Sequence, residues 1–570
     1  LLTTPGTAYT KTNIISDTQL QVSSAVNIGS ASGYGRQYVP NSGTAAVVIG
    51  NTGLTDATTT ITLDQDATVL TLTIGSTGLL TAQQLVNQAT VRNLSVVANL
   101  TINRTSGVVS NGWNIGTGTA SVAGDINLGD GYLAGTNASR IAFITLTSGT
   151  LTARNIRFKT PTNAGTSASA RIDMSTVSGG VAATLNTTGN MTFSPGGRLI
   201  QNTAVGSTVN FTGTTPQTIV YPSIGTNSSF HHMNFNNSSS DGVTLGYALT
   251  TANLTGNVNV QSGKVQTAYA ITGNGTRTFQ LGSGATYEMT STTDNTGEFP
   301  TGFGTYTLNT ASTTIFNQDA DNIDISSTPT YGNLSILNNR GTTARTYTLA
   351  NGTINVAGNL TIGDGTNSTG VSGGGTNSKL NVTGDFTIGS TGTLDLTANF
   401  STATDGISVY GNWTNNGTFT TDGNPAVTAR FVKTGASALQ TIGGTSPTSF
   451  YNLTINMGNA TSTVQMLNDV TVTGVLTLTQ GGLDLNSNTL FVNNGTPATT
   501  NISRSGTAYI KSEDTSAPYG TLKWRVNTAT GSFVFPFGLS STEYIPFTFN
   551  VTSAGNAGTG DGTVSLSTYA

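Results

Sequence analysis

The chain contains no cysteine and very few charged side chains. Without cysteine, neither a disulfide framework nor a thiolate metal site can form, so stability has to come from backbone hydrogen bonds and burial. Charged residues make up 8% of the 570 residues, against about 25% in an ordinary soluble domain. The 21 basic and 25 acidic side chains give a net charge of −4, and the basic ones are thinly spread. We therefore expect no nucleic-acid partner.

Long apolar runs are also missing from the sequence. No run approaches the roughly 18 residues of a membrane span, so we predict no membrane-spanning segment. The chain begins at Leu1 without an initiator methionine or a positively charged leader, which favours a processed chain or a fragment of a longer one. A surface poor in charge and rich in threonine and asparagine is typical of a secreted or cell-surface protein.

Turn-forming and β-branched residues are abundant instead. Threonine, asparagine and serine are frequent, there are 71 glycines, and 35% of the residues are hydrophobic. The usual helix-formers are scarce, and the apolar content is enough to build a core. The composition therefore predicts an all-β protein.

A short unit, Val-x-Gly-x-apolar-x-apolar, recurs along the chain. Its strong copies begin at Val122, Leu254, Val356, Val382 and Val472. In each copy the apolar residues and the glycine share one parity, which is the signature of a strand with one buried face. An inward glycine at the same place in successive strands indicates a bulge, a bend or a close approach of backbones.

A second unit, aromatic-x-Asn-Leu-x-apolar, precedes several of these copies. It begins at Tyr331 and Phe450, and a diverged copy at Phe230 contains the chain's two histidines, His231 and His232. About 21 to 24 residues separate its Leu or Met from the next repeat glycine, which is within the range for one coil of a repeat protein. The two units therefore read as successive rungs of a stack with coils of about 22 residues.

These rungs predict an elongated, right-handed parallel β-solenoid over residues 57–500, because one coil cannot bury its apolar face alone. Residues 1–56 lack the repeat and are expected to form an N-terminal arm or cap. Residues 501–570 are rich in aromatic residues such as Trp524 and are expected to form a small β-sandwich-like domain. Solenoid ends expose unpaired strand edges, so an arm such as Leu1–Leu20 could complete a neighbour's sheet in end-to-end self-association.

Three acidic residues are the candidate metal ligands. Asp319, Asp321 and Asp324 place carboxylates close together and could hold calcium, although the run lacks the glycine and distal glutamate of an EF-hand loop, and a solvated turn is the alternative. His231 and His232 are neighbours in a strand and should point to opposite faces, so they would not share a metal. One should replace the anchor asparagine while the other faces solvent.

No catalytic set is visible in the sequence. Carboxylates rarely fall in pairs and no serine–histidine–aspartate arrangement is apparent, so we expect no catalytic residues, no enzyme activity and no cofactor other than the calcium considered above. The three tryptophans are read as core residues. A polysaccharide-active enzyme or glycan-binding module remains the alternative, and it requires carboxylates and basic groups to converge in a cleft on one solenoid face.

The repeats resemble a known group of proteins. The segment Phe450–Ile455, followed by Val470–Leu478 and Gly482–Asn486, resembles the β-strand repeats of large surface proteins exported by type IX secretion in Bacteroidota. The tail at Tyr519–Arg525 and Phe533–Phe547 is similar to the module that often follows those repeats, ahead of a sorting domain. The resemblance covers most of the chain after residue 57.

The resemblance implies a secreted or cell-surface location and an adhesive or structural role. It supplies no catalytic residues. No sorting domain is visible before Ala570, so we expect that the domain was cleaved or that the chain continues. The function expected from the sequence is therefore that of an extracellular structural or adhesive protein, and its specific form is the subunit of a homopolymeric filament.

Overall fold

The fold is known from a computed structural model of the chain. The chain is 56% strand and 1% helix. No helix within the described residues is both long and apolar enough to cross a membrane. Besides short strands between residues 3 and 28, the structure describes residues 42–49, 59–63, 66–75, 82–88, 92–105, 109–131, 141–159, 170–194, 196–220, 229–293, 298–321, 323–341, 343–363, 366–374, 377–397, 400, 406–421, 427–514, 517–554 and 562–569.

The chain divides into two compact units, one made of Leu1–Thr286 with Pro300–Tyr306 and the other of Tyr287–Phe299 with Thr307–Ala570. The strands that lie wholly in the first unit are β1 (Thr3–Thr4), β2 (Thr7–Ala8), β3 (Ile14–Ser16), β4 (Gln19–Leu20), β5 (Val26–Ile28), β6 (Ser42–Ile49), β7 (Thr59–Leu63), β8 (Ala67–Ile74), β9 (Gln84–Gln88), β10 (Asn93–Val96), β11 (Leu100–Arg104), β12 (Asn111–Gly116), β13 (Thr119–Gly131), β14 (Ala142–Leu146), β15 (Thr150–Phe158), β16 (Ala170–Met174), β17 (Thr184–Thr187), β18 (Met191–Phe193), β19 (Gly197–Gln201), β20 (Thr208–Phe211), β21 (Gln217–Val220), β22 (His232–Asn237), β23 (Val243–Leu245), β24 (Val258–Thr267) and β25 (Thr278–Leu281).

Strands β26 (Thr286–Met289) and β27 (Thr305–Leu308) lie where the chain divides into the two units. The second unit contains β28 (Thr313–Asn317), β29 (Ile323–Ile325), β30 (Thr330–Tyr331), β31 (Asn333–Leu337), β32 (Arg345–Leu349), β33 (Thr353–Val356), β34 (Leu360–Ile362), β35 (Thr369–Gly373), β36 (Lys379–Val382), β37 (Phe386–Ile388), β38 (Gly392–Asp395), β39 (Ile407–Val409), β40 (Trp413–Asn415), β41 (Thr418–Thr420), β42 (Thr428–Phe431), β43 (Leu439–Gly443), β44 (Thr448–Phe450), β45 (Asn452–Asn456), β46 (Thr463–Met466), β47 (Val470–Val472), β48 (Leu476–Gln480), β49 (Gly482–Asp484), β50 (Thr489–Val492), the 3-10 helix η1 (Thr499–Asn501), β51 (Ile502–Arg504), β52 (Tyr509–Lys511), β53 (Thr521–Arg525), β54 (Gly531–Phe535), β55 (Phe547–Val551) and β56 (Thr563–Leu566).

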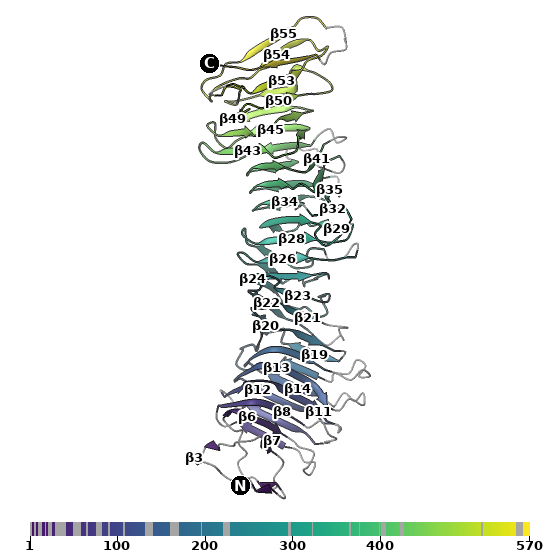
Figure 1. Cartoon of the computed structure of the whole chain (residues 1–570), viewed down its shortest axis with the longest axis vertical. Helices are drawn as coiled ribbons and strands as arrows, with labels where there is room; N and C mark the ends of the chain where they lie inside the picture. The colour runs from purple at the N-terminus through teal and green to yellow at the C-terminus, as the bar shows by residue number, and fades with distance from the viewer. Residues whose placement is uncertain are drawn as a thin grey trace. The chain divides into compact units, whose positions relative to one another are not determined.

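Stacked parallel coils form a β-solenoid of about 15 turns, which confirms the predicted fold class. In the first unit, β7, β9, β12, β14, β16 and β19 form one sheet in which each strand comes from a different coil. In the second unit one coil supplies β32, β33 and β34, and the next supplies β35, β36 and β37, which pair with them in the same order. Figure 1 shows these strands lying one above another within each unit.

The two repeated sequence units are successive rungs, as predicted. Leu334 of the aromatic unit pairs in parallel with Leu360 of the glycine unit, and Leu453 pairs in the same way with Leu476. The diverged copy that contains the histidines pairs with its glycine unit through Met233. The coils vary in length more than expected, because hydrogen bonds between equivalent corners span from 20 to 35 residues. Loops at the corners absorb this variation without disturbing the pairing.

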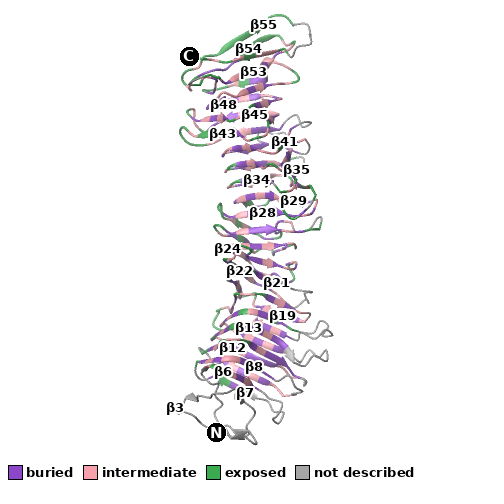
Figure 2. Ribbon diagram, viewed as in Figure 1, coloured by how far each residue is buried: buried purple, intermediate pink, exposed green. Residues whose placement is uncertain are grey.

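The core of each unit is built from the inward side chains of these rungs. Buried residues alternate with partly exposed ones along most strands (Figure 2). Equivalent inward side chains stack from coil to coil: the rings of Phe386 and Trp413 have centroids 4.6 Å apart, and those of Phe158 and Phe193 are 4.4 Å apart. All three tryptophans are fully buried, which confirms their expected role in the core.

The repeat glycine lies at a corner of the coil. The unit read as one strand is in fact two strands, because β33 ends at Val356 and β34 begins at Leu360, with Gly358 between them. One coil later, a Cβ on Gly384 would lie 2.3 Å from Oδ1 of Asn359. The glycine is therefore required by a bend and by the close approach of the preceding coil, two of the three explanations that its pattern allowed.

Parallel pairing continues past residue 500 in the second unit. Strands β51, β52 and β53 extend the sheets that contain β48, β49 and β50. Antiparallel pairing follows, with β56 against β53 and β54 against β55, and Trp524 of β53 packs on Phe533 and Phe535. Toward the other end of the chain β6 pairs in parallel with β8, so the solenoid sheet includes residues before position 57. The limits of a separate arm and a separate C-terminal domain remain predictions.

Candidate functional site

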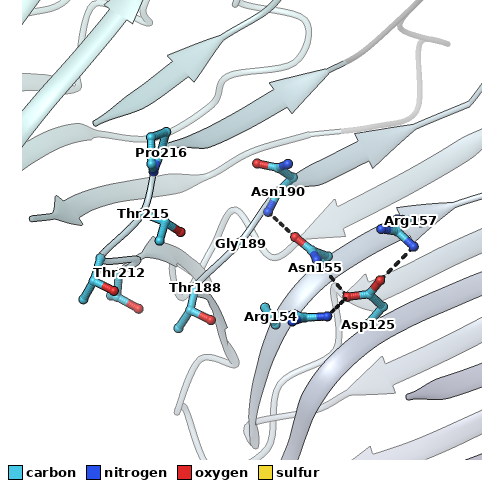
Figure 3. A pocket seen from close by; sticks show the side chains of 11 residues that line it. Asp125, Arg154, Asn155, Arg157, Thr188, Gly189, Asn190, Thr212, Thr215 and Pro216 are labelled. Carbon is cyan, nitrogen blue, oxygen red and sulfur yellow. Dashed lines mark hydrogen bonds and ion pairs between the residues drawn. The ribbon is translucent and has the colours of Figure 1, made fainter. Parts of the chain in front are cut away.

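A groove on the first unit is the candidate site (Figure 3). It has a volume of about 480 Å³ and is lined by 11 residues from neighbouring coils. Its charged side chains are Asp125 of β13 and Arg154 and Arg157 of β15. The remaining lining residues are Asn155, residues 188–190 at the corner between β17 and β18, and residues 212 and 214–216 between β20 and β21.

Asp125 holds both arginines through its carboxylate. Nη2 of Arg154 lies 2.9 Å from its Oδ1, and Nη1 of Arg157 lies 2.7 Å from its Oδ2. Nδ2 of Asn155 donates a further hydrogen bond to Oδ1, at 2.7 Å. The Asp125 side chain is 11% exposed, whereas those of Arg154 and Arg157 are 56% and 47% exposed. Figure 3 shows Asp125 joined to Arg154, Asn155 and Arg157. The carboxylate is thus largely enclosed, while about half of each arginine side chain remains open to solvent.

These contacts favour the ionised form of Asp125. Partial burial by itself raises the pKa of the carboxyl group, but the hydrogen bonds from Asn155 and Arg154 and the positive charges of Arg157 and Arg154 more than offset this, so the pKa is lowered. A carboxylate with a lowered pKa is a poor general acid near neutral pH. Its role in the groove is to position the two arginines.

A chain of side-chain to backbone hydrogen bonds fixes the corners that form the groove. Oδ1 of Asn155 accepts a hydrogen bond from the backbone N–H of Asn190 at 2.7 Å, and Oδ1 of Asn190 accepts one from the N–H of Thr218 at 2.8 Å. Each bond joins one coil to the next and satisfies a backbone donor that the corner would otherwise leave free. The corners that line the groove are therefore joined to one another from coil to coil.

The rest of the wall offers neutral hydroxyl and amide groups. Thr188, Thr212, Thr214 and Thr215 are exposed, and within the described part of the chain their hydroxyl groups make no hydrogen bond. The only carboxylate among the described lining residues is Asp125. The chemistry available is thus two guanidinium groups that can bind an anion, next to groups that can exchange hydrogen bonds with a hydroxyl-rich ligand.

Sequence reasoning missed this groove. Asp125 is separated from Arg154 by 29 positions, and only the stacking of coils brings them together. The signal that could have revealed it is a departure from the repeat. Arg157 faces outward, and the residues paired with it in the two neighbouring coils are Asn127 and Thr192. Arginine in a row of small neutral residues departs from the local pattern, and such departures are expected at functional sites.

The predicted calcium ligands have protein partners in the structure. Arg345 lies 2.7 Å from Oδ1 of Asp319 through Nη2 and 2.9 Å from Oδ2 of Asp321 through Nη1. Asp324, in β29, accepts a hydrogen bond from the hydroxyl of Thr348. No group of three or more potential metal-binding side chains was found among the described residues. Two of the three carboxylates are thus paired with the guanidinium group of Arg345. Calcium binding at these residues remains a prediction.

One of the two histidine predictions is confirmed and the other is wrong. His232 replaces the anchor asparagine, because its Nδ1 accepts a hydrogen bond from the N–H of Asn257 at 3.2 Å. His231 does not face solvent but is 1% exposed, and the two rings meet edge to face with centroids 4.3 Å apart. The alternation rule fails because β22 begins at His232, so His231 belongs to the corner before it.

The surroundings of His231 disfavour its protonation. Burial lowers its pKa to about 4, with further contributions from the charges of His232 and Arg277. Its Nδ1 lies 3.0 Å from the hydroxyl of Thr255. The neutral ring is therefore part of the packing between two coils.

We compared the chain with protein-family models, with curated proteins and with solved structures, and none of them matches it.

Proposed function

We propose that this chain is an extracellular structural and adhesive protein of the cell surface. The observation that carries the proposal is that outward-facing side chains of successive coils are hydrogen-bonded to one another. These side chains are neutral and form rows whose hydrogen bonds join one coil to the next, as expected of a structural protein. A secreted or cell-surface location is part of the proposal, supported by the composition and by the resemblance of the repeats to exported surface proteins.

The clearest of these rows lies in the first unit. Nδ2 of Asn210, Asn234 and Asn259 each donates a hydrogen bond to the asparagine one coil earlier, the first of them to Asn186, at 2.8, 2.9 and 2.8 Å. The four asparagines occupy β17, β20, β22 and β24. Such a ladder of side-chain amides reinforces the backbone pairing without introducing charge.

A homopolymeric filament is the specific form of this proposal. Self-association needs an exposed apolar surface that is stabilised when another copy buries it, and β55 presents such a surface. Phe547 and Phe549 of this strand are 46% and 36% exposed, and Ile545 just before it and Val534 of β54 are also exposed. Among the described residues β55 pairs only with β54. Exposed apolar groups on a strand with an unpaired edge favour pairing with another copy of the chain. The predicted docking arm, Leu1–Leu20, lies largely outside the described residues.

Electron microscopy of the purified chain tests the filament. We expect fibres of indefinite length, and we expect Phe547→Ser combined with Phe549→Ser to shorten or abolish them. Deletion of residues 1–20 should do the same if the arm completes the neighbouring sheet. Matched substitutions of exposed leucines elsewhere, such as Leu439→Ser and Leu467→Ser, serve as the control. Single particles at every concentration would refute the filament.

Glycan binding is the second candidate, and the groove is the observation that favours it. Glycoside hydrolysis normally needs two carboxyl groups that flank the scissile bond. Asp125 is the only carboxylate among the described lining residues and is already paired. We therefore favour binding over hydrolysis. Release of oligosaccharides from a polymer incubated with the purified chain would instead support an enzyme.

A further inference from the structure

We propose that the groove at Asp125, Arg154 and Arg157 binds an acidic polysaccharide, one that carries carboxylate or sulfate groups. This inference rests on the proposed adhesive role and names the kind of partner to which the surface would adhere. The argument uses the charge left over in the groove, the direction in which the groove runs and the chemistry of its neutral wall.

The charge in the groove is not balanced. Two guanidinium groups share one carboxylate, so the three side chains carry one net positive charge in a chain whose net charge is −4. Each guanidinium has five N–H donors, and the contacts with Asp125 join one nitrogen of each. Both arginine side chains are about half exposed. They can bind an arriving carboxylate or sulfate without first being freed from the protein.

Asp125 prevents the two arginines from moving apart. Without it, the two like charges of Arg154 and Arg157 on β15 would repel each other and rotate into solvent. The carboxylate is enclosed by Arg154, Asn155 and Arg157, and its pKa is lowered. The arginines are therefore held in place before a ligand arrives, which reduces the entropy lost on binding.

The shape of the groove suits a polymer. Its lining residues come from β13, from β15 and from the corners that follow β17 and β20, which are successive coils. Three steps of about 4.8 Å between paired strands make it roughly 14 Å long in the stacking direction. An extended chain can lie across these corners with an acidic group at the arginines and the following hydroxyl groups at Thr188, Thr212 and Thr214.

The wall favours a saccharide over an acidic peptide. Apart from Pro216, the described lining side chains are hydroxyl, amide or charged groups, with a glycine at position 189. Peptide recognition usually adds apolar pockets or a free strand edge, whereas hydroxyl and amide groups match the many hydroxyl groups of a sugar chain. Nucleic acid is disfavoured because basic side chains are few over the chain as a whole.

Binding of defined polymers to the full chain tests the inference. Calorimetry or surface-based binding would use polygalacturonate for carboxylate groups, dextran sulfate for sulfate groups, unmodified dextran as the neutral control and polyglutamate as the acidic peptide. We expect one or both acidic polysaccharides to bind and to weaken as salt is raised, while dextran does not bind. Which of the two binds more tightly identifies the acidic group.

Three variants distinguish binding in the groove from non-specific electrostatic attraction to the chain. Arg154→Gln with Arg157→Gln should weaken binding about tenfold or more, since two charge-assisted contacts are lost. Asp125→Asn should weaken binding about threefold or more, because a neutral amide no longer holds the two guanidinium groups in place by its charge. Arg430→Gln, which removes a positive charge in the second unit, should leave binding unchanged.

The Asp125→Asn variant keeps the test decisive if the double arginine variant folds poorly, because it retains both arginines and changes only the contact that positions them. Circular dichroism checks that this variant is folded. Equal binding by wild type and the double variant, equal binding by wild type and Asp125→Asn, equal binding of dextran, or tighter binding of polyglutamate would each overturn the inference. If electron microscopy shows filaments but these binding tests fail, only the proposed role of the groove is overturned. Absence of filaments would leave the binding result unaffected.

Discussion

Oδ1 of Asn359 accepts a hydrogen bond from the backbone N–H of Asp385, 2.9 Å away, and the two residues occupy the same corner in successive coils. The same relationship joins Asn333 to Asn359 and Asp385 to Asn412, at 2.9 and 2.7 Å. At each corner the side-chain oxygen therefore joins one coil to the next, as backbone hydrogen bonds do along each strand. It also explains the repeat glycine, since the oxygen occupies the space that a side chain on the following coil would need.

Replacing a repeat glycine should therefore destabilise the second unit. A Cβ on Gly384 would lie 2.3 Å from Oδ1 of Asn359 and 2.5 Å from the carbonyl oxygen of Gly358, which cannot move without breaking the pairing. We expect Gly384→Ala to cost about 1 to 3 kcal/mol, measured by urea unfolding. Gly495→Ala is the matched control, because nothing lies within 4 Å of the added carbon. Equal midpoints for the two variants would contradict the corner explanation.

Removing the ring of Trp413 should leave a large cavity. The side chain is fully buried, stacks on Phe386 and meets Phe419 and Phe450 with ring centroids 4.9 and 5.3 Å away. We expect Trp413→Ala to lower the free energy of unfolding by about 3 to 5 kcal/mol, and Trp413→Phe to lower it much less because one aromatic ring is retained. Urea titration followed by circular dichroism measures both. A similar loss in both variants would show that stacking at this position is unimportant.

His231 should make the first unit sensitive to mild acid. Its pKa in the folded chain is about 4, below the usual value of 6.5, so between these values the unfolded chain binds a proton that the folded chain does not. Stability should therefore fall as the pH drops from about 6.5 to about 4, with no further loss from this group below that range. His231→Gln should flatten the dependence of the melting temperature on pH. The same dependence in the variant and the wild type would assign the acid sensitivity to other groups.

Arg345 should determine whether calcium has any effect on Asp319 and Asp321. In the wild type the guanidinium is already paired with both carboxylates. We expect Arg345→Gln to lower the stability slightly, and millimolar calcium to raise the melting temperature of this variant more than that of the wild type. Magnesium serves as the control ion, because it adapts less readily to irregular oxygen ligands. An equal rise with calcium in both proteins would indicate a metal site that coexists with Arg345.

Much of the solenoid could be predicted because its interactions are repeated. Burial of Leu360 and Ile362 on either side of Thr361 follows the alternation in the sequence, and the same pattern recurs in the next coil at Phe386. Each copy of a repeat has the same backbone conformation, so the rungs, their parallel stacking and the need for a glycine in the unit could be inferred without coordinates. That the glycine lies at a corner between two strands was shown only by the structure. The error over His231 arose at a corner, where alternation no longer applies.

The groove could not be predicted in the same way. Asp125 and Arg154 meet because the coil between them has one particular length, and that length varies freely among the loops of this chain. Likewise, Arg345 reaches Asp319 across 26 positions, and no local pattern relates the two. The amino-acid sequence by itself determined the all-β class, the rungs and the inward faces, because those depend on short-range periodicity. Only the tertiary structure decided which charged side chains meet, because that depends on how many residues each loop adds before the next coil begins.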